Sequence, residues 1–175
     1  MGSEYIRSFA GRGKVVLIVT SMIVLLVGLH SQLDSHWKRW HESEYNLAIL
    51  DSMKAKGYSV PAYSMEVYFV TIIQVFSILT LINFGVSMII NTTAGILKYI
   101  DIGYHIVAAL LLLIAGIVYI ISAKQIGNLS LSWIDKSDMK LRVGLKIFAG
   151  SVTIIHSIVY GVVAFVIAKE SHVVP

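Results

Sequence analysis

The sequence predicts an all-α membrane protein, an antiparallel bundle of four transmembrane helices with a partly helical first extramembrane loop. The first observation is composition: 57% of the 175 residues are hydrophobic and 14% are charged, whereas soluble domains carry about 25% charged residues. The second is that four apolar runs are long enough to cross a bilayer as helices, which takes roughly 20 residues. They also lack the alternation of barrel strands.

These runs predict one four-helix transmembrane domain over residues 1–175. The helices are expected at about 15–33, 67–90, 102–123 and 143–168. The first run lacks a small-x-small cleavage site, so we expect a membrane helix rather than a removable signal peptide.

The large loop at 34–66 contains too many apolar residues for a flexible linker. Glu42 and Glu44 come early in it and Lys54 comes late. A helix macrodipole favours this order of charges. We therefore expect a short helix at about 42–56.

Aromatic residues gather near the end of the first membrane helix, at Trp37, Trp40 and Tyr45. Trp and Tyr are enriched at the headgroup level of membranes. This favours an interfacial belt with an amphipathic flap on the membrane. The same residue types are common anchors of protein interfaces, so a partner-binding loop is the alternative.

Polar residues recur inside the second run. Gln74 and Asn83 are nine residues apart, which is about two and a half helical turns, so they face opposite ways. Because polar side chains in lipid seek protein partners, we expect this helix to contact neighbours on more than one side. A polar transport path is the alternative, but it would need carboxylates at mid-depth.

Small residues recur every four positions in the fourth run, at Ala149, Thr153, Ser157 and Gly161. Such a ridge lets helix backbones approach closely. We expect it to pack within the bundle, and homo- or hetero-oligomerisation through the same ridge is the alternative.

Three histidines raise the hypothesis of a haem site, because two His can ligate one iron. They are His30, His105 and His156. At 1.5 Å per residue, the last two differ in depth by roughly 12 Å, and the first belongs to the opposite surface. The sequence therefore predicts no haem, and no cofactor other than a lipid or cholesterol.

The chain contains no cysteine, which excludes disulfides, thiolate metal sites and cysteine nucleophiles. His36 and His41 are poorly spaced for a shared metal on a helix. No nucleophile–base set can be assembled, so we expect neither an enzyme nor a metal protein. The scattered charges give no support for a nucleic-acid partner.

A weak cholesterol motif is matched by Lys98, Tyr104 and Val107.

Basic residues give conflicting signals for orientation. Five lie on the side of the two tails and nine on the other side, and cytoplasmic segments normally carry the excess. The basic residues that flank the first helix favour the opposite orientation, with cytosolic tails. With cytosolic tails, the sequon at Asn128 faces the lumen or exterior and the sequon at Asn91 does not.

An ionisable pair opens the third run, since Asp101 and His105 are one helical turn apart. An acidic side chain at a helix start can cap free N–H groups and oppose the positive end of the dipole. The pair therefore predicts a helix cap rather than a reactive site.

Two segments carry a family resemblance. "DIGYHIVAALLLLIAGIVYI" resembles the third transmembrane helix of the MARVEL-domain family in its Asp101, its Tyr104–His105 pair and its alanine-rich run. "SVTIIHSIVYGVVAFVIAK" is similar to the fourth helix in His156 and Tyr160. The resemblance also extends to an aromatic residue and a basic stop in the fourth helix, at Phe165 and Lys169.

The resemblance implies a non-enzymatic tetraspan protein with cytosolic tails, in the plasma membrane or endomembrane vesicles. Such proteins organise membrane microdomains, vesicle traffic, cell junctions or membrane apposition. Their partners are the bilayer and other membrane proteins. An accessory subunit of a larger channel, pump or respiratory complex fits the residues equally well, and a small transporter or haem-binding membrane protein is a minor alternative.

Overall fold

A computed structural model of the protein describes residues 2–33, 35–90, 95–133 and 141–170. These residues form seven helices and no strand. In chain order the helices are α1 Gly2–Arg7, α2 Phe9–Leu33, α3 His36–His41, α4 Glu44–Ala55, α5 Tyr63–Ile89, α6 Gly95–Trp133 and α7 Val143–Lys169.

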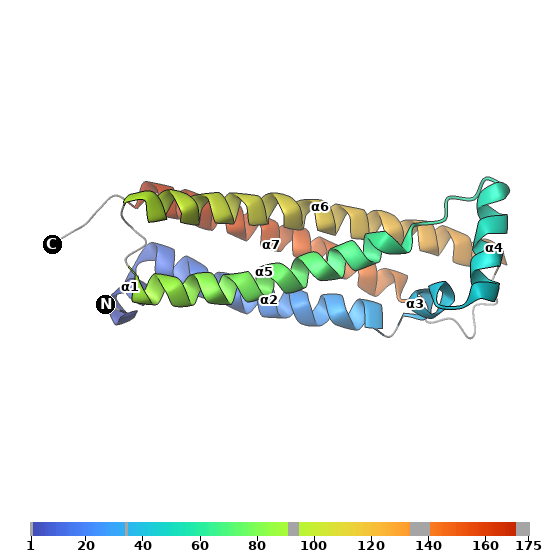
Figure 1. Ribbon diagram of the computed structural model, residues 1–175, viewed down its shortest axis with the longest axis horizontal. Helices are drawn as coiled ribbons and strands as arrows, with labels where there is room; N and C mark the ends of the chain where they lie inside the picture. Colours follow the sequence, from blue (N-terminus) through green and yellow to red (C-terminus); the bar gives the residue numbers. More distant parts are fainter. Residues whose placement is uncertain (1, 34, 91–94, 134–140, 171–175) are drawn as a thin grey trace.

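The four long helices form an antiparallel bundle, and the two ends of the chain lie at the same end of it (Figure 1). Helix α2 packs against α5 and α7, and α6 packs against the same two helices. Going round the bundle, the order is therefore α2, α5, α6, α7. Helices α2 and α6 lie on one diagonal, and α5 and α7 lie on the other. The predicted all-α, four-helix fold is confirmed.

Three of the four helices are longer than predicted. Helix α2 begins at Phe9 rather than near residue 15, and α5 begins at Tyr63. Helix α6 has 39 residues, which makes it about 58 Å long, against a hydrocarbon core of about 30 Å. The sequence analysis marked only the uninterrupted apolar runs, but a helix continues through polar residues where they have protein partners.

Helices α3 and α4 form a cap at the end of the bundle opposite the termini, with α4 running across that end (Figure 1). The loop helix predicted at about 42–56 is present as α4, Glu44–Ala55, and α3, His36–His41, precedes it as a second short helix that the sequence did not predict. Trp37 is buried in the cap, with Leu50 and Met53 of α4, against Ile126 and Leu129 from the extension of α6. The cap is thus a small second core that rests on α6, which explains why the loop is so rich in apolar residues.

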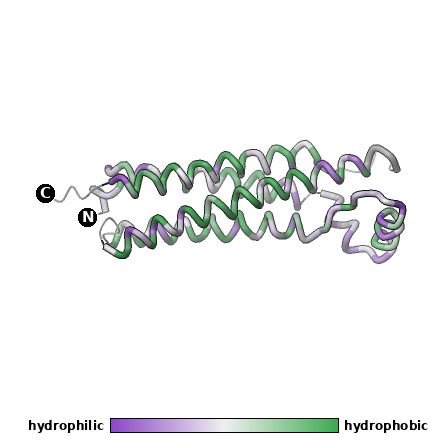
Figure 2. The backbone as a smooth tube through the Cα atoms, turned by 90° about the horizontal axis from the view of Figure 1, so that it is seen from above, coloured by the Kyte–Doolittle hydropathy of each residue, from purple (hydrophilic) through white to green (hydrophobic). Residues whose placement is uncertain are grey.

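The outward faces of the bundle are apolar. Figure 2 shows the bundle coloured mainly as hydrophobic, with more hydrophilic colour in the cap. Large apolar side chains such as Leu26, Ile82, Leu110 and Phe165 are exposed on all four long helices. Four helices are long and apolar enough to span a membrane. The chain is an integral, multi-pass membrane protein, because lipid is the solvent that such a surface requires.

Candidate functional site

An ion pair lies inside the bundle near the end that carries the termini. Lys14 of α2 and Asp101 of α6 have side chains only 1% and 4% exposed, and Lys14 Nζ lies 2.6 Å from Asp101 Oδ2. The two residues come from helices on the same diagonal, so the pair crosses the centre of the bundle. A buried charge is tolerated in such a place when it is paired and hydrogen-bonded.

Three further side chains complete this cluster. Lys14 Nζ donates a hydrogen bond of 2.7 Å to Ser87 Oγ, and Asn83 Nδ2 donates one of 3.0 Å to Asp101 Oδ1. His105 Nδ1 lies 2.7 Å from the backbone oxygen of Asp101 and 3.3 Å from its Oδ1. Helices α2, α5 and α6 therefore meet at one carboxylate.

The expectation that Asp101 caps the start of a helix is wrong. Helix α6 begins at Gly95, six residues earlier, so the carboxylate lies beyond the first turn, where it has no free N–H groups to cap. Its partners are the side chains of Asn83 on the adjacent α5 and of Lys14 on the diagonal α2. His105 does lie one turn away and on the same face, as the spacing indicates.

A second ion pair lies near the opposite end of the bundle. Glu66 of α5 and Lys146 of α7 are both completely buried, and Lys146 Nζ donates a short hydrogen bond to Glu66 Oε1. These helices form the other diagonal. The second carboxylate oxygen, Oε2, has no hydrogen-bond partner within the described part of the chain.

The two pairs together tie the bundle across both diagonals. Attraction between charges is strong where water is excluded, and removing one partner of a buried pair is costly because the other charge is left uncompensated. The pairs therefore fix the relative depth of diagonal helices that do not pack closely on one another. They do so at both ends of the membrane-spanning region.

Hydroxyl groups connect helices between the two pairs. Tyr160 of α7 forms a short hydrogen bond with Thr80 Oγ1 of α5, and the hydroxyl of Tyr104 on α6 lies 3.1 Å from the same oxygen. Thr80 in turn donates to the backbone oxygen of Phe76. Tyr160 and Tyr104 are thus positioned by one threonine.

His156 is bonded through both ring nitrogens. Its Nδ1 lies 2.9 Å from Thr20 Oγ1 and its Nε2 lies 2.9 Å from Ser21 Oγ, both on α2. Bonded in this way, neither nitrogen is free for a metal. His30 is elsewhere, where Arg142 Nη1 lies 2.8 Å from its Nε2. Within the described ranges, no group of three or more His, Asp or Glu residues could hold a metal ion.

One more polar contact crosses the bundle nearer the cap. The hydroxyl of Tyr119 on α6 lies 2.7 Å from Ser31 Oγ on α2. The ring of Phe69 on α5 stacks on Tyr119, with ring centroids 3.8 Å apart. This contact again joins the α2–α6 diagonal.

The small-residue ridge of α7 faces into the bundle, since Ala149, Thr153 and Ser157 are buried, while Gly161 is exposed. The closest approach of α6 and α7, however, is next to this ridge. A Cβ atom added at Gly116 of α6 would lie 2.8 Å from the backbone oxygen of Gly150, and the reverse distance is the same. The pattern along a single helix does not reveal these two glycines, because they face each other across two helices.

Gln74 and Asn83 occupy different faces of α5, as predicted. Asn83 is half-buried and bonded to Asp101, whereas Gln74 is exposed on the lipid-facing side. The expectation that α5 contacts protein on more than one side is met within the chain by α2 and α6.

The aromatic residues of the large loop differ in exposure. Trp37 is 3% exposed and belongs to the core of the cap, so it is not a free residue of an interfacial belt. Trp40 is half-buried against the same cluster. Tyr45 is 76% exposed and remains available for a partner. Asn128 is exposed within the extended α6 rather than in a loop, and Asn91 lies outside the described residues.

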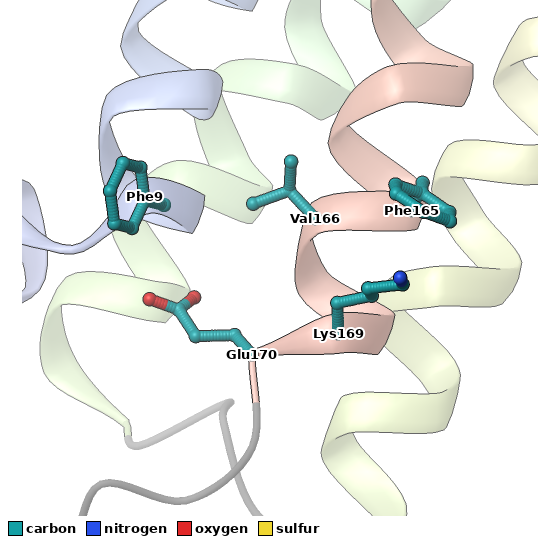
Figure 3. A pocket seen from close by; sticks show the side chains of 5 residues that line it. All are labelled: Phe9, Phe165, Val166, Lys169 and Glu170. Carbon is teal, nitrogen blue, oxygen red and sulfur yellow. The ribbon is translucent and has the colours of Figure 1, made fainter.

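An apolar hollow lies between the start of α2 and the end of α7 (Figure 3). Phe9, Phe165 and Val166 line it, and Lys169 and Glu170 lie at its edge. The Nζ of Lys169 is 5.0 Å from the centre of the Phe165 ring.

The weak cholesterol motif does not form one lipid-facing surface. Lys98 Nζ donates hydrogen bonds to the backbone oxygens of Ala168 and Glu170 at the end of α7. Tyr104 turns its hydroxyl inward to Thr80. Neither is free for a sterol.

Sequence reasoning missed three of the four charges that form the buried pairs. Lys14, Glu66 and Lys146 lie at the edges of the apolar runs, where a charge resembles an ordinary flanking residue. A lysine followed or preceded at once by an apolar run was the available signal, because a charge in a membrane segment marks a paired or functional position. When Lys14 and Lys146 are left out of the count of basic residues, the side of the two tails has four and the opposite side has eight. The conflict over orientation therefore remains.

These observations define the class of the protein, a four-helix integral membrane protein whose diagonal helices are joined by buried ion pairs. Comparison of the chain with protein-family models, curated proteins and solved structures gives no match.

Proposed function

We propose that this protein is a non-enzymatic tetraspan scaffold of the MARVEL kind, which organises membrane microdomains, vesicle traffic, or membrane apposition at sites such as cell junctions. The observation that carries the proposal is the pairing of Lys14 with Asp101 and of Glu66 with Lys146 across the two diagonals. The two pairs constrain the relative positions of all four long helices, and a fixed arrangement suits a protein that acts through its outer faces.

The bonding inside the bundle favours this role over transport. A transporter needs ionisable groups that exchange partners with a substrate or with water during its cycle. Asp101 instead accepts hydrogen bonds from Lys14 and Asn83 on two other helices, and His156 is held by two hydroxyls of α2. Asp101 and His156 are therefore already bonded to protein, as expected of a fixed scaffold.

The residues that carry the MARVEL resemblance also support a structural role. Five of them are buried in the bundle, namely Asp101, His105, Ala108, His156 and Tyr160, whereas Phe165 and Lys169 are exposed near the end of α7. They come from α6 and α7, which pack more extensively on each other than any other pair of helices. We therefore assign the resemblance to the internal framework of the fold and not to a reactive centre.

Cellular distribution tests the proposal. A fluorescently tagged chain should concentrate in cholesterol-rich membrane domains, in transport vesicles or at cell contacts, and extraction of cholesterol should disperse it. Lys14→Met should reduce this concentration, because the bundle loses its fixed shape. The matched control is Ile155→Val, which changes only a lipid-facing side chain. Uniform distribution of the wild-type chain would contradict the proposal, as would Asp101-dependent flux of ions or protons through reconstituted vesicles.

An accessory subunit of a larger channel, pump or respiratory complex is the second candidate. The specific observation in its favour is the outer side of the cap, where Tyr45 and Leu47 of α4 are exposed and aromatic residues of this kind anchor interfaces. Purification from native membranes separates the two candidates. A large, stoichiometric partner that is lost in Tyr45→Ala favours the subunit, and recovery without such a partner favours the scaffold.

We further propose that both tails are cytosolic, which places the cap and Asn128 on the luminal or exterior side. Asn128 is exposed near the cap end of α6. The test is a shift in electrophoretic mobility after glycosidase treatment that disappears in Asn128→Gln and persists in Asn91→Gln. The opposite pattern would reverse the orientation.

A further inference from the structure

The side chain of Gln74 has no hydrogen-bond partner within the described part of the chain and is exposed on α5. It is the twelfth of 27 residues in that helix, so it lies within about 3 Å of the middle of the helix. That position corresponds to the centre of the bilayer, where no water is available to the amide.

An unpaired amide is unfavourable there. Moving an amide from water into an apolar medium without a hydrogen bond costs several kcal/mol in the most apolar reference solvents, and polar side chains in membranes form hydrogen bonds between helices. Thr20, a half-buried polar residue of α2, behaves differently, because it bonds to backbone oxygens of its own helix and to His156. Gln74 therefore exposes an amide that has no partner in the described part of the chain, at a depth where a second membrane-embedded chain can bond to it.

The residues around Gln74 form a regular seam along α5, defined by steps of four and three residues. The seam consists of Val67, Thr71, Gln74, Ile78, Leu81 and Gly85. All of these residues are exposed except Gly85, which is half-buried. This alternation is the heptad spacing by which two helices pack at a small crossing angle.

Gly85 agrees with a close approach at this seam. A Cβ atom added there would have no atom within 4 Å, so packing within the chain does not require a glycine. Glycine in the middle of a helix is also unfavourable relative to alanine by about 0.5–1 kcal/mol. Gly85 lies three turns from Gln74 on the same face of α5, and its missing side chain leaves room for the backbone of another helix.

We propose that this α5 seam is the interface of a homodimer, with α5 of a second copy as its occupant. Two copies inserted in the same direction are related by a two-fold axis along the membrane normal, so residues near the axis meet their own counterparts at equal depth. A glutamine amide both donates and accepts hydrogen bonds, so Gln74 can satisfy a second Gln74. A different partner would have to supply a polar group at the same depth.

The absence of cysteine from the natural sequence permits a clean cross-linking test. Ile78→Cys places a thiol on the seam, and Ile155→Cys places one on the lipid-facing side of α7. The native isoleucines are similarly exposed, at 59% and 61%. The purified proteins are reconstituted in phosphatidylcholine vesicles at high lipid excess and oxidised with copper phenanthroline. Ile78→Cys should give a disulfide-linked dimer and Ile155→Cys should not.

Gln74 is tested in the Ile78→Cys background. Gln74→Leu should lower the dimer association constant by about threefold to tenfold, the effect of one interhelical hydrogen bond, whereas Gln74→Asn should retain part of it because the amide is kept. Equal cross-linking at positions 78 and 155 would overturn the proposal, as would unchanged dimerisation in Gln74→Leu. Circular dichroism and thermal unfolding check that each variant is folded. The result does not depend on the proposed scaffold role, because only this chain and lipid are present.

Discussion

Lys14 and Asp101 join two helices that lie diagonally across the bundle, with Nζ and Oδ2 2.6 Å apart in a buried position. Glu66 and Lys146 make the same kind of contact across the other diagonal, near the other end. Adjacent helices in a membrane are held by packing, but diagonal helices have little contact surface. Two crossed ion pairs therefore determine how deep each helix sits relative to its diagonal partner.

Removal of one partner of the first pair should destabilise the bundle strongly. In Lys14→Met the carboxylate of Asp101 stays buried and loses its counter-charge, which costs about 3–5 kcal/mol when a buried pair is broken. Thermal unfolding in mild detergent should show a large decrease in midpoint. Lys14→Met combined with Asp101→Leu should recover much of the loss, because no unpaired charge remains. The control is Lys169→Met, at the exposed end of α7, and a loss there as large as in Lys14→Met would contradict the assignment.

Exchange of both charges of the second pair should lower stability less than reversal of only one of them. Glu66→Lys and Lys146→Glu should each lower stability, since two like charges then face each other in a buried site. The double variant restores an opposite pair across the same diagonal and should be more stable than either single variant. Measurement of all four proteins in one unfolding series gives the coupling free energy. Additive effects, with no recovery in the double variant, would show that the two side chains do not interact.

The membrane-spanning architecture could be predicted from the sequence because it depends on composition and on the length of apolar runs. The helix ends could not, because they depend on contacts. Helix α2 continues back past Lys14 since that residue has partners on α5 and α6. Helix α6 continues past the bilayer because Ile126 and Leu129 are buried under the cap. Neither contact is visible in a one-dimensional pattern.

The hydroxyl of Tyr160 should make a modest contribution to stability. It bonds to Thr80, which itself donates to the backbone oxygen of Phe76. Tyr160→Phe removes this bond, worth about 1 kcal/mol, together with a long one of 3.4 Å to the backbone oxygen of Phe76, and creates no cavity. Tyr104→Phe is the comparison, because its contact with Thr80 is longer, at 3.1 Å, and only partly buried. Its unfolding midpoint should fall less than that of Tyr160→Phe, and the opposite order would contradict the geometry.

The residues of the candidate site could be predicted from the sequence, but their partners could not, again because the contacts join different helices. Asp101, His105, His156 and Tyr160 were identified from their residue types and spacing, but their partners lie on other helices. Spacing along one helix gives the face of a side chain and not the residue opposite. The role given to Asp101 was therefore wrong, although its importance was recognised.

The crossing of α6 and α7 should not accept even one methyl group. An alanine at Gly116 would bring its Cβ to 2.8 Å from the backbone oxygen of Gly150 and from Cγ1 of Ile154, and such overpacking costs about 1–3 kcal/mol. Gly103→Ala on the same helix is the matched control, because its Cβ would meet nothing within 4 Å. It should leave stability unchanged or raise it by about 0.5–1 kcal/mol. Equal effects of the two substitutions on the unfolding midpoint would contradict a close helix crossing.

The cap should unfold separately from the bundle when its central residue is removed. Trp37 is 3% exposed among Leu50, Met53, Ile126 and Leu129, and Trp→Ala in a core costs about 3–5 kcal/mol. Local opening follows the loss of local contacts, and the cap contacts the bundle only at the ends of α5, α6 and α7 in this cluster. Amides of α4 should therefore exchange with deuterium much faster in Trp37→Ala, whereas those of the membrane-spanning helices should keep their protection.

A milder variant serves as the control for the cap. Trp40 is only half-buried at the edge of the same cluster, so Trp40→Ala removes fewer contacts and should accelerate exchange in α4 by a smaller factor. Loss of protection throughout α2 and α7 in Trp37→Ala would show that the cap and the bundle form one cooperative unit. Unchanged exchange in α4 would show that Trp37 does not hold the cap together.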